Sequence, residues 1–328
     1  VLAAESSIAE AVRTVDEACG LLPADVPAAA RQEVLTAATQ VDTLASRYAP
    51  ALERLHQALK EALASGMRLR AAVIRFNIAA VGYHTNETTD WLDLNDQALH
   101  EFRRFGLPML VAKCQGNRGL MMLQMKRPGD AATEILAAVQ AHRDAGLKRG
   151  MLLHMNNYGL ALRDSGRPEE ALAVYREAEA LALEMDDMTH ATRIIGNIGA
   201  AYFTMGRLEE ALEHALRAAA ILKKGDPTES LALNQGNAGL CLLRMRRIGE
   251  AEVLIAEARE TWDRLRLGST RPVWNVLSDL ALIQAESGQA GKARETARDA
   301  IRRATGSGWL AHASPDDRER MEKLRALA

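Results

Sequence analysis

The sequence predicts an all-α protein in which about seven helix pairs stack into a right-handed solenoid, with one further helix at each end. Three observations support this prediction: self-similarity at a step of 40 residues, abundant alanine and leucine, and glycines that recur where helices should end. Apolar residues make up 48% of the chain and aromatic residues only 4%, a composition that favours helices over sheet.

The chain opens with an amphipathic pattern that lies outside the repeats. Residues 4–19 carry apolar side chains at helical spacing, among them Ile8 and Val12. Pro23 interrupts this pattern because proline cannot continue a helix. We therefore expect residues 1–31 to form a leading helix and a linker.

Each repeat is anchored on a small residue of its first helix, and alanines follow at fixed distances. The anchors are Thr39, Ala79, Gly119, Gly159, Gly199, Gly239 and Ala281. Twelve positions later stand Ala51, Trp91, Ala131, Ala171, Ala211, Ala251 and Ala293. Nineteen positions after the anchors stand Ala58, Ala98, Ala138, Ala178, Ala218, Ala258 and Ala300. Small residues in register indicate helices that approach closely, so we expect the anchors to be structural. The repeats are expected near residues 32–66, 72–106, 112–146, 152–186, 192–225, 232–266 and 274–306.

The expected helix ends recur with the repeat. The residues just beyond them are Gly66, Gly106, Gly146, Asp186, Gly225, Gly268 and Gly306. A glycine at this place can adopt the left-handed conformation that caps a helix. Acidic pairs such as Glu209 and Glu210 open second helices, where negative charge is favourable. Residues 315–327 form a charged final helix within a capping segment at 307–328.

The repeats resemble the tetratricopeptide repeat over roughly residues 32–306, and residues 152–186, 192–225 and 232–266 match it best. In that family a Gly or Ala of the first helix is followed by a Tyr-like residue three positions later and by two alanines of the second helix. Gly199, Tyr202, Ala211 and Ala218 match this pattern. The family repeat has about 34 residues, so the longer step predicts longer second helices and longer connections. The long repeat is similar to kinesin light chains and to sensor arrays of bacterial transcription regulators and peptide receptors. The resemblance implies that the first helices line a concave groove.

The position two residues before each anchor, here named the slot, is rich in asparagine. The slot residues are Ala37, Asn77, Asn117, Asn157, Asn197, Asn237 and Asp279. Asparagine is a mediocre helix former, so helix propensity does not account for these residues. A carboxamide donates and accepts hydrogen bonds, so it can pair with the N–H and C=O of a peptide together. A similar asparagine ladder in kinesin light chains and bacterial peptide receptors implies peptide binding here.

Cationic residues near the slot are candidates for selecting side chains or a terminal carboxylate. They are Lys113, Arg163, Arg193, Arg244 and His84. A second interpretation stays open, in which the asparagines bond one another or the adjacent backbone and fix the register of the helices. Both interpretations are compatible, because an empty groove is wet and its amides bond water.

Composition and motifs argue against several functions. The formal net charge of −2 gives no bulk attraction to nucleic acid or to an anionic membrane. The histidines and cysteines form no metal-binding motif and no phosphate-binding loop occurs, so we expect no metal, no cofactor and no enzymatic activity. Three cysteines, no signal peptide and no long apolar run predict a cytoplasmic protein with reduced thiols. Because Val1 is first, we expect a piece of a longer protein.

The sequence therefore predicts a protein- or peptide-binding module, and it is similar to the sensor or interaction domain of a bacterial regulatory protein. Its partner is expected to be a peptide, a segment of another protein or another part of its own parent chain. The alternative is a scaffold or dimerisation solenoid without a peptide ligand. The identity of the ligand and the oligomeric state, including a homodimer, stay open.

Overall fold

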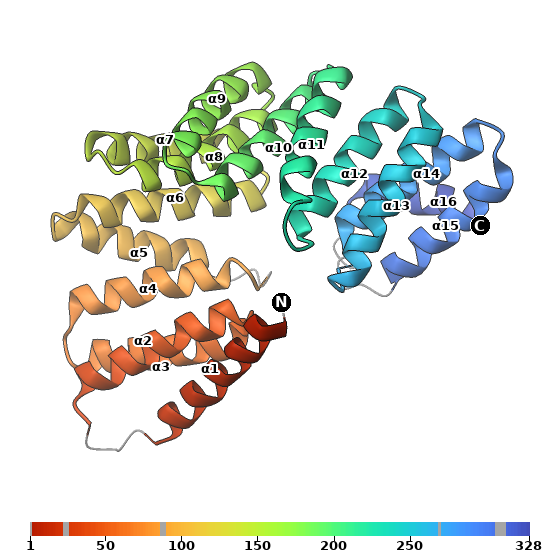
Figure 1. The fold of residues 1–328 in the computed structure, drawn as a ribbon. Coiled ribbons are helices and arrows are strands. Elements are labelled where there is room, and N and C mark those ends of the chain that lie inside the picture. Colours follow the sequence, from red (N-terminus) through yellow and green to blue (C-terminus); the bar gives the residue numbers. More distant parts are fainter. Residues whose placement is uncertain (1, 22–25, 86–89, 268–269, 306–312) are drawn as a thin grey trace. The chain divides into compact units, whose positions relative to one another are not determined.

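The computed structural model describes residues 2–21, 26–85, 90–267, 270–305 and 313–328. These residues form sixteen α-helices and contain no strand, which confirms the predicted all-α class (Figure 1). The chain divides into two compact units, residues 1–165 and 166–328, and each is described by itself.

The first unit contains the leading helix and the helices of the first repeats. Its helices are α1 (Leu2–Gly20), α2 (Ala28–Leu44), α3 (Tyr48–Ala64), α4 (Arg68–Gly82), α5 (Trp91–Arg104), α6 (Pro108–Gln124), α7 (Pro128–Asp144) and α8 (Lys148–Asp164). Consecutive helices pack side by side from α1 to α8. The helix predicted for residues 4–19 is confirmed by α1.

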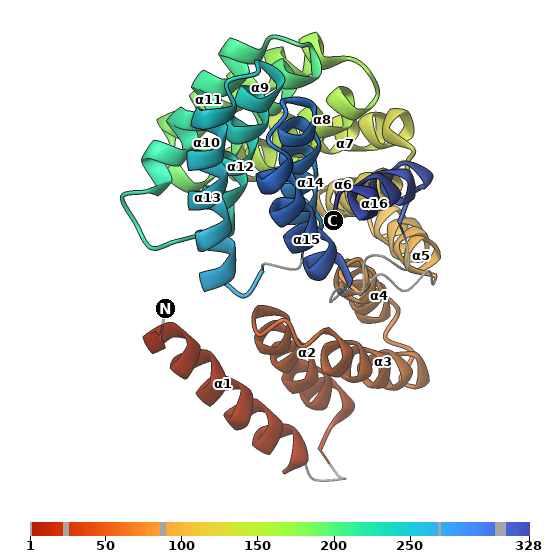
Figure 2. The ribbon, with the colours of Figure 1, turned by 90° about the vertical axis from the view of Figure 1, so that its right-hand side faces the viewer.

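The second unit contains the remaining repeats and the final helix. Its helices are α9 (Pro168–Glu184), α10 (Met188–Thr204), α11 (Leu208–Leu222), α12 (Glu229–Arg244), α13 (Ile248–Arg264), α14 (Arg271–Glu286), α15 (Ala290–Thr305) and α16 (Pro315–Leu327). Figure 2 shows the helices of this unit from a second side. The predicted final helix at 315–327 coincides with α16, which packs on α14 and α15 and begins with a capping box formed by Ser314 and Asp317.

The 40-residue step arises from two helices of about equal length and two tight turns. Helices α6, α7 and α10 each have 17 residues, and most connections have three, as at residues 125–127. The prediction of longer connections was therefore wrong, and the extra length is not confined to the second helices. A left-handed residue recurs about every 20 positions: Ser46, Gly66, Gly106, Lys126, Gly146, Gly166, Asp186, Gly206, Arg246, Arg266 and Gly288.

The turns share the Schellman motif. After α10 the N–H of Gly206 donates to the carbonyl of Phe203 at 3.0 Å, and the N–H of Arg207 donates to the carbonyl of Tyr202 at 3.0 Å. Gly225 does not take the left-handed conformation, so its predicted role was wrong. That glycine lies in the longer connection after α11, which ends at Leu222. The predicted caps Gly268 and Gly306 lie outside the described residues.

The anchors lie where the two helices of a pair cross. A Cβ atom at Gly119 would lie 2.3 Å from Ile135 Cγ1, and a Cβ atom at Gly239 would lie 2.6 Å from Ile255 Cγ1. The alanines nineteen positions after the anchors are all fully buried. Small residues are therefore required at these crossings, because a larger side chain must displace the second helix.

The second repeat departs from the pattern through two compensating changes. Trp91 stands where other repeats have alanine, and its ring lies over Gly82 of α4. A Cβ atom on Gly82 would lie 2.4 Å from the Trp91 ring. The glycine thus makes the room that the indole occupies.

First helices of successive repeats also touch one another. Helix α4 contacts α6, α6 contacts α8, α10 contacts α12, and α12 contacts α14. Glycines three residues before the anchors receive side chains of the next first helix. His154 fills the notch at Gly116, and Asn234 fills the equivalent notch at Gly196. These contacts bring the slots of neighbouring repeats onto adjacent helices within each unit.

Candidate functional site

The slot residues lie on the accessible side of the first helices. Asn77, Asn117, Asn157 and Asn197 are half-buried and Asn237 is exposed, whereas the anchors two positions later are buried. The residues five positions after the anchors are all exposed: Leu44, His84, Gln124, Asp164, Thr204, Arg244 and Glu286. The pairing of a buried anchor with accessible residues on the opposite side follows from the helical period.

In the first unit, three carboxamides occupy slots on helices that touch in turn, α4, α6 and α8. Asn77, Asn117 and Asn157 make no hydrogen bond to one another in the part of the chain that the structure describes. Asn157 Oδ1 accepts from Asn156 Nδ2 at 3.3 Å, and Asn117 Nδ2 is shielded from solvent without a hydrogen-bond partner. These contacts do not support a ladder of mutually bonded asparagines in this unit.

In the second unit, the slots on α10 and α12 carry Asn197 and Asn237. The next slot, on α14, carries Asp279 instead. Arg320 of α16 forms an ion pair with Asp279, with Nη1 3.1 Å from Asp279 Oδ1. The same Nη1 donates to Ser278 Oγ at 3.2 Å, and the guanidinium lies over the Trp274 ring at 5.7 Å. Burial raises the pKa of the Asp279 carboxyl, while Arg320 and Arg244 oppose that shift. The final helix therefore supplies a charge partner for the carboxylate of the last slot.

The candidate cationic side chains differ in their exposure and in whether they form an ion pair. Lys113, Arg193 and Arg244 are exposed, and Arg244 lies 6.0 Å from the ring centroid of Phe203. Arg163 donates from Nε and Nη2 to the carboxylate of Asp164 at 2.9 and 2.7 Å. Arg163 is therefore already paired in the structure.

The exposed imidazole of His84 lies just beyond the end of α4. Its ring stacks on Tyr48 with a centroid distance of 5.1 Å and an interplanar angle of 11°. Asn77 lies on α4 and His84 follows the end of that helix by two residues, while Lys113 and Asn117 share α6, which contacts α4.

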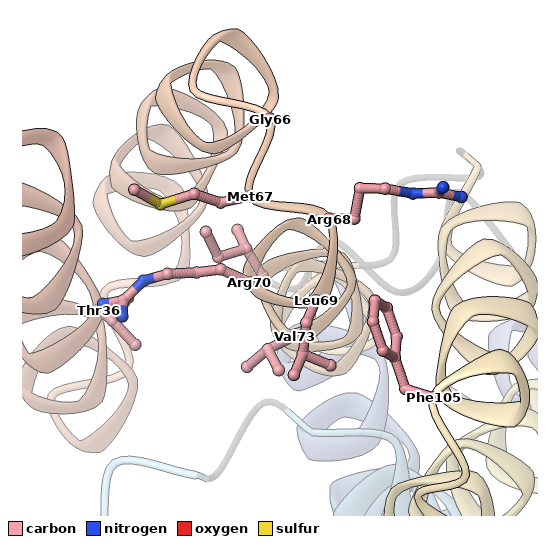
Figure 3. Close-up of a pocket in the computed structure, with 9 residues that line it drawn as sticks. Thr36, Gly66, Met67, Arg68, Leu69, Arg70, Val73 and Phe105 are labelled. Carbon is pink, nitrogen blue, oxygen red and sulfur yellow. The ribbon is translucent and has the colours of Figure 1, made fainter.

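A cavity at the beginning of α4 was not predicted from the sequence. It has a volume of about 770 Å³ and lies between Thr36 of α2, the first turns of α4 and Phe105 after α5. Figure 3 shows Leu69 and Val73 at its centre with Phe105 beside them, and Arg70 pointing toward Thr36. Residues far apart in the sequence form it, so no local pattern could reveal it.

A smaller cavity lies beside the last slot in the second unit. It has a volume of about 370 Å³ and is lined by Arg244, Arg246, Asp279 and Glu286 together with apolar residues of α12 and α14. Arg246 pairs with Glu286 at 2.8 Å. The wall of this cavity is thus largely self-neutralised, although Arg244 remains exposed.

Two buried histidines lie next to each other below the slots of the first unit. The rings of His142 and His154 have centroids 4.9 Å apart, and His142 Nδ1 donates to the Ala138 carbonyl at 2.8 Å. His154 Nδ1 is buried without a partner. Desolvation lowers the pKa of His154 to about 4, with further lowering from His142 and Lys113. His154 is therefore neutral at neutral pH.

Within the described residues, no three His, Cys, Asp or Glu side chains lie close enough together to hold a metal ion. The three thiols, Cys19, Cys114 and Cys241, are free, and burial raises the pKa of Cys114 to about 12 and that of Cys241 to about 11. Buried neutral thiols are poor nucleophiles. No helix among the described residues has the length and the apolar run that crossing a membrane requires.

The comparisons with known proteins agree with this architecture. The family model of the tetratricopeptide repeat matches residues 155–184, which confirms the resemblance predicted from the sequence. No curated protein matches the chain.

Three solved structures illustrate the structural similarity. The apo form of the quorum sensor NprR from B. thuringiensis has a TM-score of 0.69 at 15% identity, covering 92% of this chain and 84% of that one. Aspartyl phosphate phosphatase F from Bacillus subtilis has a TM-score of 0.65 at 16% identity, with coverages of 83% and 70%. A Rap protein complexed with competence and sporulation factor has a TM-score of 0.60 at 15% identity, with coverages of 85% and 80%. At such identities the likeness shows the fold.

Proposed function

We propose that this chain is the sensor or interaction module of a bacterial regulatory protein and binds an extended peptide segment through the asparagines of its slots. The ligand is a peptide, a segment of a partner protein or another part of the parent chain. The proposed role is non-enzymatic and cytoplasmic, with no nucleic acid, membrane or cofactor as partner.

The observation that carries this proposal is the position of the slot carboxamides in the first unit and the lack of hydrogen bonds among them. They lie on adjacent helices at accessible positions, and no hydrogen bond joins Asn77, Asn117 and Asn157 to one another. Packed helices are roughly 8–10 Å apart, and an extended peptide advances about 3.3 Å per residue. Asparagines on successive first helices can therefore each meet the backbone of a peptide every two or three residues.

The named structural relatives are consistent with a sensory role. One is a quorum sensor and another was solved in complex with competence and sporulation factor. A third is named a phosphatase, so the proposed absence of catalysis needs its own test. The raised pKa values of the buried Cys114 and Cys241 thiols support the proposal, because a neutral thiol is a poor nucleophile.

The experiment is a selection from a display library of random twelve-residue peptides. It compares the wild type with Asn77→Ala/Asn117→Ala in the first unit and with Asn197→Ala/Asn237→Ala in the second. The control is Gln140→Ala, which removes an exposed carboxamide from α7, a second helix. Thermal melting of all variants is recorded in parallel.

We expect at least one asparagine pair to be required for peptide retention. The Asn77→Ala/Asn117→Ala variant should melt within about 2 °C of the wild type, because both side chains are only half-buried and Asn117 Nδ2 has no hydrogen-bond partner to lose. A large loss of stability with retention unchanged per folded molecule would favour structural asparagines. The scaffold or dimerisation alternative would be favoured if the wild type retained no peptide.

A further inference from the structure

The cavity at the beginning of α4 has a distinctive chemistry. Leu69 and Phe105 are 39% and 45% exposed, and Met67 and Val73 add half-buried apolar surface. Its volume of about 770 Å³ falls within the range of ligand pockets, roughly 300–1,000 Å³. Apolar walls of this kind favour a large apolar side chain, since its burial removes apolar surface from water.

The charged residues of the cavity lining are both cations. Arg68 and Arg70 line it, and no acidic residue does. Arg70 lies 3.6 Å from Glu33, whose side chain is 73% exposed, and the Arg68 side chain is 58% exposed beside Glu101. The pair of Arg70 with the exposed Glu33 contributes little stability, so a ligand carboxylate can replace Glu33.

The cavity is continuous with the asparagine slots along α4. Val73 precedes Asn77 by one helical turn, so the two side chains lie on the same face about 6 Å apart. On the other side of the cavity, the slot of α2 carries Ala37, which offers no carboxamide. An apolar cavity therefore lies beside Asn77, the first slot asparagine of the unit.

We infer that this cavity is the specificity-determining subsite of the first unit and takes a bulky apolar side chain that stands next to an acidic side chain in an extended peptide. The inference rests on the proposed function, since Asn77 holds the backbone one or two residues away. The asparagines contact only the backbone of the peptide. The cavity binds the apolar side chain of the peptide, and Arg70 pairs with the carboxylate of the neighbouring acidic residue of the peptide.

The test repeats the display selection with three variants of the full chain, which change the exposed Leu69 and Leu136 and the half-buried Arg70. Leu69→Asp places a charge in the cavity but in the first turn of α4, where an acidic residue is tolerated. Arg70→Gln removes the cation alone. Leu136→Asp is a control matched in exposure, because Leu136 is 43% exposed on α7 and lies outside the cavity. Circular dichroism melting verifies that each variant is folded.

We expect the wild type to enrich peptides with adjacent apolar and acidic residues. Leu69→Asp should weaken binding of a selected peptide about tenfold or more. This is the loss in affinity expected when the apolar side chain of the peptide is no longer buried in the cavity. Arg70→Gln should keep the apolar preference and lose the acidic one, and Leu136→Asp should behave as the wild type.

The failures of the two proposals are distinguishable. Peptides that depend on the asparagines but show no apolar and acidic pair, and that bind Leu69→Asp normally, would overturn the cavity and leave the proposed function standing. Peptides that carry the apolar and acidic pair, lose binding to Leu69→Asp and still bind Asn77→Ala/Asn117→Ala would support the cavity and contradict the role of these asparagines. No retained peptide would contradict both.

Discussion

The side chains on the first helices meet very different surroundings within a few residues of one another. Asn157 is half-buried on the accessible side of α8, whereas His154, three residues earlier, is 7% exposed and fills the notch at Gly116. The same helix therefore leaves one polar side chain partly accessible to solvent and buries its near neighbour in a contact between repeats. The burial of His154 affects how the stability of the protein depends on pH.

His154 is expected to make the protein less stable in mild acid. The pKa of His154 falls from an ordinary 6.5 to about 4 in the folded chain, because burial disfavours the imidazolium. The unfolded chain binds the proton more readily, so stability is complete above about pH 6.5 and decreases as the pH falls toward 4. At pH 5 the loss from this group amounts to about 2 kcal/mol.

Chemical denaturation of the wild type and of His154→Asn between pH 7 and pH 5 checks this. Asn234 already fills the equivalent notch at Gly196, so asparagine is a side chain that this fold accepts there. The variant should lose less stability than the wild type over that interval, whatever its stability at pH 7. Parallel pH dependences would show that His154 is not the titrating group.

At the scale of the helix pair, the close crossing at the anchor is expected to limit stability. A Cβ atom on Gly199 would lie 3.2 Å from the Ala211 carbonyl oxygen and 3.3 Å from His214 Cβ. Gly199→Leu should therefore cost about 1–3 kcal/mol, because the backbone of α11 must move. The measurement is thermal melting.

A matched glycine separates crowding from helix propensity. Gly249 lies in the first turn of α13 and has no atom near the position of a Cβ. Gly249→Leu should leave stability unchanged or raise it, because leucine is the better helix former. If both variants melted alike, close approach at the anchor would not be the reason for the glycine.

The ion pair between Arg320 of the final helix and Asp279 in the slot of α14 is expected to stabilise the folded protein. Arg320→Ala leaves the partly buried Asp279 without its partner at 3.1 Å and should cost about 1–3 kcal/mol. Adding Asp279→Asn should restore most of this loss, because a neutral carboxamide needs no cation. Denaturant unfolding of the single and double variants measures the rescue, and an additive loss would contradict it.

The sequence was sufficient to predict the structural features that every repeat shares. It was insufficient to predict contacts that occur at only one place in the chain. Alanines such as Ala178 are fully buried, as predicted, because the same position meets the same crossing in every repeat. The notch at Gly116 depends on which side chain the next repeat presents, and the cavity near Leu69 depends on Phe105 from another turn. Likewise, the pair between Asp279 and Arg320 needs a helix outside the repeat.

At the scale of the whole molecule, stacked repeats should unfold locally. In the second unit Ile255 packs beneath Gly239, within a core that extends to Leu324 of α16. The first unit has a separate core that contains Leu55 and Ile78. Because each helix contacts mainly its neighbours, damage in one unit should spread little.

Native-state hydrogen exchange tests this locality. Ile255→Ala should cost about 2–5 kcal/mol and accelerate exchange in α12, α13 and adjacent helices, while α3 and α4 stay protected. Leu55→Ala should give the reverse pattern. Equal acceleration throughout the chain by either variant would show a single cooperative unit instead.

The central claim is that slot asparagines bind a peptide backbone, and the most direct measurement follows their side-chain amides. Protein labelled with ¹⁵N-asparagine is titrated with a peptide from the display selection while the carboxamide NH₂ resonances are recorded. The resonance of at least one of Asn77, Asn117, Asn157, Asn197 and Asn237 should shift strongly. The resonance of Asn95, which is buried and donates to the Cys114 carbonyl at 3.0 Å, should stay in place. Saturating peptide that moves none of the slot resonances would contradict the account.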